Sequence, residues 1–352
     1  MLVVPPPFVF LTLAGCGNSA YEAPASGGSA AATPVAASPL TGTLVWVAEA
    51  DGVARATART LPEGPNRPLV PGTDASFPAS VSPDGASVLV ITTHEDAAGH
   101  LERLLRVPLD GGAPVELAGP AQFVRNPAWT PDGTAVVFES SAASFRDLYR
   151  VPAVGGAPTR LTDAPHGSFD PALSPDGATV AFVSSRDGNA ELYAQPLAGG
   201  PAVRLTGDPG DDAHPAWRAD GARLAWIATR EGHPRVWTMA ADGTDPAPLR
   251  AGLGDDLAFA WSPDGRTLAV VTQVAADNID LAVIDAVRGV VRADLGSPGV
   301  DENPAWSADG RWLTFASTRD GDPEVYVVEA DGTGLRRLTT RVGPDWLPRW
   351  GR

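Results

Sequence analysis

A short turn of the form Ser-Pro-Asp-Gly, or a close variant of it, recurs six times along the chain. Its aspartates are separated by 48, 44, 44, 44 and 45 residues, and they are Asp84, Asp132, Asp176, Asp220, Asp264 and Asp309. A fixed period of this length is typical of a blade array, in which each repeat forms one supersecondary unit. Most prominent residues of this chain are therefore prominent because they are repeated.

One repeat, residues 168–206, contains four short runs that read as β-strands. Its turn is followed by an apolar run at 179–183, an alternating run at 191–195 and a last run at 202–206, with polar or Gly-rich turns between them. A single four-stranded sheet cannot bury both faces, whereas sheets in a ring pack on their neighbours. We therefore expect an all-β fold, a β-propeller of four-stranded antiparallel blades.

The two ends of the chain predict how the ring closes. Residues 43–72 match strands two to four of a repeat whose first strand is missing, and Asp345 to Trp350 repeat the Asp301 to Trp306 segment at a spacing of 44. We expect the C-terminal strand to join the N-terminal blade, which removes the open sheet edges. This count gives seven blades; six is the alternative if the N-terminal unit pairs differently.

Charge and composition restrict the partners. The net charge is −16 and the chain contains no Lys, so an acidic surface faces any ligand. Such a surface repels phosphate backbones, which argues against nucleic acid, and it favours a soluble monomer. The 38 Gly and 35 Pro fit many short strands joined by tight turns.

The N-terminal 40 residues differ from the rest. An apolar run at 8–15 ends at Cys16, the one cysteine, and Leu-Ala-Gly-Cys resembles a bacterial lipobox, which implies lipidation of that thiol. The segment before it lacks the usual basic residues. We expect a lipoprotein signal peptide at 1–16, a flexible Ala/Ser/Gly/Pro linker at 17–40 and a propeller at 41–352. The lipid would be the only membrane contact.

Three motifs that recur among the repeats carry a family resemblance, and the two best matches are residues 184–193 and 317–326. The pattern Pro-Ala-(Trp/Leu)-Ser-Pro-Asp-Gly, then Arg-Asp-Gly-x-x-Glu-(Leu/Val)-Tyr, then Arg-Leu-Thr resembles the WD-like repeats of TolB-type propellers over about residues 43–352. TolB is a periplasmic protein of the envelope Tol system that binds other proteins and carries a further N-terminal α/β domain. The resemblance thus implies a stand-alone lipoprotein form on the periplasmic side of the envelope. Gly17 after Cys16 favours the outer membrane.

Polar residues just before the inner strands are the candidate binding site. If these strands converge on the axis, the residues ring one mouth of a central channel, where they focus negative potential and offer oxygen ligands to a cation. Turn capping is the alternative role for them. The candidates are Asn126, Asp170, Asp212, His214, Asp256, Asp301, Asn303 and Asp345.

Catalytic constellations are scarce in this sequence. No Gly-x-Ser-x-Gly elbow occurs, so a peptidase of the prolyl oligopeptidase class is not expected. Oligogalacturonate-lyase-like propellers hold a divalent metal in the channel, and His166 and His214 are the weak candidates for such a role here. The expected function is a non-enzymatic, lipid-anchored module that binds an envelope protein or glycan without a cofactor. The alternative is a metal-dependent polysaccharide lyase or hydrolase with a divalent cation in the channel.

Other repeated residues are interpreted as structural. The Arg-Asp-Gly segments that begin at Arg186 and Arg319 are expected to form turns, and His94, His100 and His233 are expected on solvated loops. The tryptophans of the inner strands should fill the space between blades, because aromatic side chains bury the large area needed there. They are Trp129, Trp217, Trp261, Trp306 and Trp350.

Overall fold

The computed structural model describes residues 39–351, apart from 73, 97–98, 122, 142–144 and 251–253. The predicted signal peptide with Cys16, and nearly all of the predicted linker, lie outside these residues. The large compact unit begins at Leu40, which is buried. Across the described residues no helix has the length and apolar character needed to cross a membrane.

Seven four-stranded antiparallel sheets make up the fold, which confirms the predicted seven-bladed propeller. Each sheet runs from an innermost strand, through two middle strands, to an outermost strand. Blade 1 holds β28 (Asp345–Gly351), β1 (Gly42–Ala50), β2 (Val53–Leu61) and β3 (Arg67–Pro68). Blade 2 holds β4 (Ala75–Val81), β5 (Ser87–Asp96), β6 (Gly99–Pro108) and β7 (Val115–Ala121). Blade 3 holds β8 (Val124–Trp129), β9 (Ala135–Ser140), β10 (Asp147–Pro152) and β11 (Thr159–Arg160).

The remaining four blades follow in chain order. Blade 4 holds β12 (Ser168–Leu173), β13 (Thr179–Ser184), β14 (Glu191–Pro196) and β15 (Val203–Arg204). Blade 5 holds β16 (Asp212–Trp217), β17 (Arg223–Arg230), β18 (His233–Ala240) and β19 (Ala247–Pro248). Blade 6 holds β20 (Asp255–Trp261), β21 (Thr267–Ala275), β22 (Asn278–Asp285) and β23 (Val291–Asp294). Blade 7 holds β24 (Asp301–Trp306), β25 (Trp312–Ser317), β26 (Glu324–Glu329) and β27 (Arg336–Arg337).

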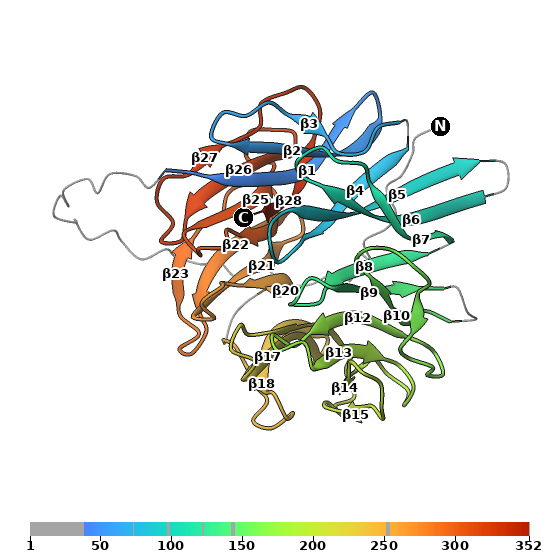
Figure 1. The fold of residues 1–352 in the computed structure, drawn as a ribbon. Helices are drawn as coiled ribbons and strands as arrows, with labels where there is room; N and C mark the ends of the chain where they lie inside the picture. Colours follow the sequence, from blue (N-terminus) through green and yellow to red (C-terminus); the bar gives the residue numbers. More distant parts are fainter. Residues whose placement is uncertain are drawn as a thin grey trace, which may run out of the picture. The chain divides into compact units, whose positions relative to one another are not determined.

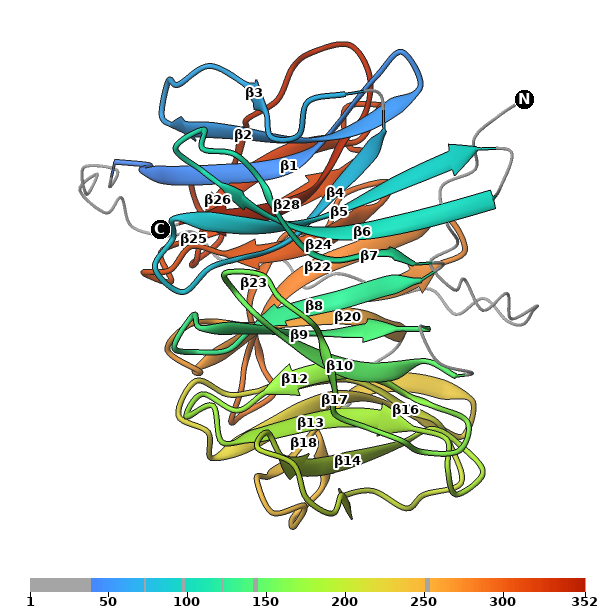
Figure 2. The same cartoon turned by 45° about the vertical axis from the view of Figure 1, so that its right-hand side comes forward.

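The ring closes where the two ends of the propeller meet. The last strand β28, dark red in Figure 1, lies beside the blue strand β1 and pairs with it from Thr43↔Gly351 to Ala48↔Asp345. The turned view in Figure 2 shows the same neighbours. Innermost strands of consecutive blades contact one another all the way round, from β4 through β24 to β28 and back to β4. The predicted closure by the C-terminal strand is therefore confirmed.

The Pro-Asp-Gly turn joins the first strand of a blade to the second. In blade 4, the Oγ of Ser174 donates to Asp176 Oδ1 at 2.5 Å, and that oxygen also accepts the N–H of Ala178 at 3.0 Å. Gly177 donates to the carbonyl of Ser174 and has a φ of 70°, a conformation that favours glycine. The turn therefore recurs because each blade needs this hairpin, and its recurrence does not indicate a binding motif.

Apolar clusters fill the space between neighbouring blades, as the tryptophans predicted. Trp217 packs with residues of blades 4 and 5, and its indole N–H donates to the carbonyl of Ala172 in the preceding blade at 3.1 Å. Trp129, Trp261 and Trp306 donate to the preceding blade in the same way. Each indole therefore joins two innermost strands while burying its ring between their sheets.

An arrangement that we call the Arg–Thr latch explains the Arg-Leu-Thr motif. In blade 4, Glu191 is fully buried; Arg204 donates to its Oε1 at 2.7 Å and Thr206 to its Oε2 at 2.6 Å. The Thr206 hydroxyl also accepts the N–H of Leu192 at 2.9 Å. Blade 3 repeats the latch with Asp147, Arg160 and Thr162, and blade 7 repeats it with Glu324, Arg337 and Thr339. The latch attaches a two-residue outer strand to its sheet.

The Arg-Asp-Gly segments make contacts within their own blade. The Tyr326 hydroxyl donates to Asp320 at 2.5 Å, and the Arg319 guanidinium lies 5.0 Å from the centre of the Tyr326 ring. In blade 4, Tyr193 donates to Asp187 and Arg186 lies over the same ring at 4.4 Å. These contacts support the interpretation of the segments as structural turns.

Candidate functional site

The innermost strands of five blades carry a left-handed residue directly before a proline. A residue with positive φ breaks the ladder, and the pairing of each of these strands shifts at this point. Asn, Asp and His enter this conformation more readily than other non-glycine residues. The five residues are Asn126, Asp170, His214, Asn303 and Leu347, with φ of 47°, 52°, 54°, 57° and 55°.

Three of these residues form one hydrogen-bonded line across blades 3, 4 and 5, which we call the bulge array: Asn126, Asp170 and His214. The Asn126 Nδ2 donates to Asp170 Oδ1 at 2.8 Å. The other oxygen of Asp170 lies 3.1 Å from His214 Nδ1 and accepts the His214 backbone N–H at 3.3 Å. Asn126 is exposed, and the His214 side chain is 62% exposed. The array therefore presents fixed polar groups that solvent reaches.

Glu139 of β9 accepts hydrogen bonds from two members of the bulge array. Its side chain is fully buried, and its Oε1 accepts Asn126 Nδ2 at 2.6 Å and the backbone N–H of Asp170 at 2.7 Å. Its other oxygen lies 3.5 Å from Arg146. Burial, reinforced by the charge of Asp170, raises the pKa of Glu139 to about 6.

We expect Glu139 to make stability fall as pH rises. Its pKa is about 6 in the folded chain and 4.5 ordinarily, so its contribution is fully present below pH 4.5 and is lost as pH passes 6. The difference corresponds to about 2 kcal/mol. Glu139→Gln should remove this dependence, so the free energy of unfolding of the wild type relative to the variant should fall by that amount between pH 4.5 and 7.5. Urea titrations at several pH values measure it; parallel curves would contradict the assignment.

Within the bulge array, Asp170 and His214 shift each other's pKa. Burial opposes ionisation of Asp170, but the hydrogen bonds from His214 outweigh it, so the pKa of Asp170 lies below its usual value. The hydrogen bond to Asp170 in turn raises the pKa of His214. The pair therefore favours an imidazolium held against a carboxylate.

Asp170→Asn is expected to lower the pKa of His214, because the amide cannot stabilise the charged ring as the carboxylate does. Titration of the imidazole resonances by NMR measures this change. Asp163→Asn is the matched control. Asp163 is 87% exposed and pairs with Arg160, so it is an aspartate outside the bulge array. A His214 pKa that is equal in wild type and Asp170→Asn would refute the coupling.

The structure separates the eight predicted site residues into two sets. Four of the aspartates are not exposed at a rim, contrary to the prediction. Asp212, Asp301 and Asp345 have no exposed surface and Asp256 is 2% exposed. Each begins an innermost strand or follows its first residue and forms an ion pair with an arginine; the pairs are Asp212–Arg230, Asp256–Arg250, Asp301–Arg319 and Asp345–Arg341, at 2.9, 3.1, 3.0 and 2.8 Å. Their oxygens hold the blades and are closed to a partner.

The other predicted residues are not all part of the array. Asn303 has the bulge conformation, but among the described residues no hydrogen bond joins it to the array. Burial raises the pKa of its neighbour Glu302. His166 is exposed, and its ring centre lies 6.1 Å from that of Phe145.

The residues present do not fit the predicted divalent cation. Within the described ranges, no group of three or more His, Cys, Asp or Glu side chains is placed to hold a metal ion. Of the two weak candidates, His214 is bonded to Asp170, whereas His166 contacts Phe145. The three histidines expected on loops lie instead near the hairpin ends of strands β5, β6 and β18. Each pairs with a carboxylate at 2.9 Å: His94 with Asp74, His100 with Glu102 and His233 with Asp255.

Sequence reasoning missed two residues near the axis. Glu139 gives no signal, because it sits within an ordinary apolar strand pattern. Arg349 does give a signal in the sequence, because it replaces the alanine of Pro-Ala-Trp in the last repeat. Its Nε donates to the carbonyl of Ala79 in blade 2 at 2.8 Å, and burial lowers its pKa to about 10. Val81 takes the place of the tryptophan in blade 2, and at this seam Arg349 of the adjacent blade 1 makes the contact between the two innermost strands.

Two family profiles match parts of the chain. Residues 143–273 match the Tricorn protease N-terminal beta propeller domain, and residues 251–351 match the TolB beta propeller domain. The Tol-Pal system protein TolB of Geobacter sulfurreducens is 41% identical over 69 residues, which are 18% of this chain and 16% of that protein. TolB of Syntrophus aciditrophicus is 47% identical over 45 residues, 13% of this chain and 10% of that one. The matched segments thus span a small part of these relatives.

Solved structures share the fold over most of the chain. TolB from Acinetobacter baumannii has a TM-score of 0.58 at 19% identity, covering 88% of this chain and 82% of that one. An oligogalacturonate lyase in complex with manganese has a TM-score of 0.63 at 15% identity, covering 87% of each chain. A puromycin hydrolase has a TM-score of 0.67 at 19% identity, covering 86% of this chain and 53% of that one. With its repeats, its seven blades and its TolB-matching segments, the chain is a TolB-like β-propeller.

Proposed function

We propose that this propeller is a non-enzymatic binding module of the bacterial envelope that holds a protein or glycan partner at the bulge array. The observation that carries the proposal is the line of Asn126, Asp170 and His214, which lies across three blades with two members exposed. Buried Glu139 fixes the orientation of Asn126. Preorganised donors and acceptors of this kind lower the entropic cost of binding amide or hydroxyl groups.

The TolB relatives support an extracytoplasmic location and a protein partner. Both relatives are proteins of the Tol-Pal system. The acidic charge of −16 also favours a partner with basic character, because complementary charge accelerates encounter.

Capture of partners by three forms of the protein tests the proposal. Residues 39–352, which include the buried Leu40, are immobilised as wild type and as the double variant Asp170→Asn/His214→Asn, and both are exposed to envelope extracts and a glycan array. Asparagine tolerates the left-handed backbone, so the variant should keep its fold. We expect a retained partner that the double variant loses and that the control His233→Asn, a substitution at the first residue of β18, keeps. Equal capture by all three proteins, or turnover of a polysaccharide, would overturn the proposal.

The lyase alternative has one observation in its favour, which is the fold shared with an oligogalacturonate lyase in complex with manganese. That likeness lies at 15% identity and concerns the fold alone. Metal analysis and thermal unfolding with and without manganese test it. A metal-free, folded sample whose melting temperature does not respond to divalent cations would remove this alternative.

We also propose that Cys16 carries a lipid that anchors the propeller, on the strength of the Leu-Ala-Gly-Cys segment after an apolar run. Cys16→Ser should move the protein from the membrane fraction to the soluble fraction. Cell fractionation measures this, and an unchanged distribution would refute the anchor.

A further inference from the structure

Blade 6 has the acid of the Arg–Thr latch without the rest of it. Asp280 on β22 pairs with Thr272 in the register that Glu191 has with Ser184 and Glu324 has with Ser317. The latch acid of blades 3, 4 and 7 thus has an equivalent here. The chain then departs from the pattern at the outer strand.

The outer strand of blade 6 aligns with the others through one backbone bond. Leu295 donates to the carbonyl of Leu281, just as Leu205 donates to Leu192 in blade 4. The residues on either side of Leu295 are therefore the latch positions. They are Asp294 and Gly296, where blade 4 has Arg204 and Thr206. Both partners of the acid are therefore replaced around Asp280, which is half-buried, and an aspartate stands where blade 4 has the arginine.

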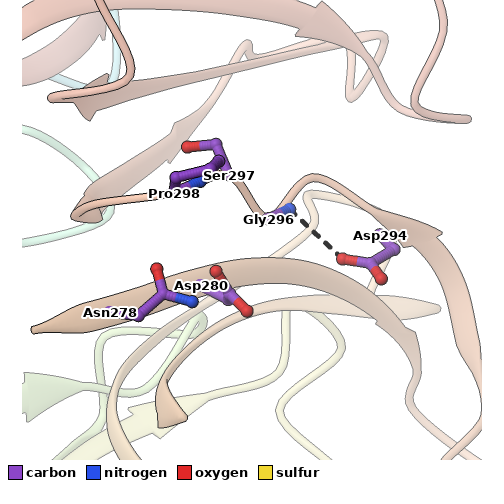
Figure 3. A pocket seen from close by; sticks show the side chains of 6 residues that line it. All are labelled: Asn278, Asp280, Asp294, Gly296, Ser297 and Pro298. Carbon is purple, nitrogen blue, oxygen red and sulfur yellow. Dashed lines mark hydrogen bonds between the residues drawn. The ribbon is translucent and has the colours of Figure 1, made fainter. Parts of the chain in front are cut away.

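A shallow cavity, wide open to solvent, marks the place of the missing groups. It has a volume of about 280 Å³ and is lined by Asn278, Asp280, Asp294, Gly296, Ser297 and Pro298. Figure 3 shows Asn278 and Asp280 pointing from β22 toward the Gly296–Pro298 segment, with Asp294 at the side, where it accepts the Gly296 N–H at 3.2 Å. A Cβ at residue 296 would come within 2.8 Å of Asp280 Cγ, so glycine keeps this space open.

Asp280 lacks a compensating charge in this cavity. Its Oδ1 is buried and has no hydrogen-bond partner. Burial raises its pKa, and the charges of Asp294 and Asp301 raise it further. The neighbouring Arg319 is engaged with Asp301 at 3.0 Å and the carbonyl of Leu295 at 3.1 Å. Arg292, on the same outer strand, pairs with Asp285 instead.

We propose that this cavity binds the guanidinium group of an arginine side chain presented by a partner protein. Three other blades of the same chain hold a guanidinium against the equivalent carboxylate, with N–O distances of 2.6 Å to Asp147 and 2.7 Å to Glu191 in two of them. The partner's arginine occupies the position that the latch arginine has in those three blades. It forms charge-assisted hydrogen bonds to Asp280 and Asp294. Asp280 and Asp294 are the two carboxylates of the lining, and the described residues contain no group of three or more His, Cys, Asp or Glu side chains placed to hold a metal ion, so the lining suits a planar donor group better than a metal ion.

Thermal unfolding with small probes tests the site directly. N-acetyl-arginine methylamide should raise the melting temperature of the wild type by about 2 °C or more at saturation. The citrulline analogue, which has the same shape without the charge, should have no effect. Asp280→Asn should abolish the response, whereas Asp277→Asn, an exposed acid on the same hairpin, should retain it.

A second variant restores the latch within the chain. Asp294→Arg should raise the melting temperature without any ligand, because its guanidinium pairs with Asp280, and it should no longer respond to the arginine probe. The inference is overturned if wild type does not respond to arginine, if calcium chloride alone raises its melting temperature, or if Asp294→Arg responds as wild type does. The cavity is separate from the bulge array, so these outcomes leave the proposed function untouched.

Discussion

Replacing Arg319 with methionine is expected to lower the free energy of unfolding by about 3 to 5 kcal/mol. Arg319 donates to Asp301 at 3.0 Å, and Asp301 has no exposed surface. Methionine keeps the apolar contact with the rings of Phe315 and Tyr326 but leaves the buried carboxylate without its cation. An unpaired buried charge is costly because neither water nor a counter-charge stabilises it.

Urea unfolding followed by tryptophan fluorescence measures this loss. Arg266→Met is the matched control, since Arg266 is 86% exposed and lies 3.8 Å from an exposed Asp264; it should change stability by less than about 1 kcal/mol. The double variant Asp301→Asn/Arg319→Met should recover part of the loss, because it removes the stranded charge. If Arg319→Met and Arg266→Met cost the same, the inner ion pairs do not hold the blades.

Ending the chain at Val342 is expected to abolish cooperative unfolding of the propeller. The deletion removes β28, exposes the edge of β1 and leaves Trp46 without its bond to Asp345. Open edges and uncovered apolar residues promote association between chains. Trp350→Ala is the milder test, with an expected loss of about 3 to 5 kcal/mol, because Trp350 is 9% exposed in the core between blades 7 and 1.

Size-exclusion chromatography with light scattering and thermal unfolding report on both changes. Trp350→Phe serves as the control because it retains most of the buried ring. A truncated chain that remains monomeric and melts in one sharp transition would show that blade 1 is complete without β28.

The repeat predicted most of the fold because turn, strand and core signals all agree within it. The spacing between Asp301 and Asp345 located the closing strand, and the tryptophans located the seams between blades. Such agreement between local patterns is what makes a sequence specify one structure. The limits of the prediction lie where one residue changes the local geometry.

The site was predicted only in part because of the bulges. Regular alternation would place Asp212 and His214 on the same face of β16. The left-handed backbone at His214 breaks that alternation, so Asp212 is buried and His214 exposed. Nothing in the composition of the segment marks this reversal. The cavity of blade 6, by contrast, was open to prediction, since Asp294-Leu295-Gly296 stands where other repeats have Arg-Leu-Thr.

Closure by the last strand also sets an order of events during synthesis. Trp46 and Asp345, bonded in the finished ring, are 299 positions apart. At the usual rates of translation, roughly 15 to 60 s separate their appearance. During this interval later blades can form while β1 waits with an unpaired edge. The first blade to leave the ribosome is therefore the last to be completed, and a chain stalled before Asp345 would be recognisable to proteases and chaperones by that edge.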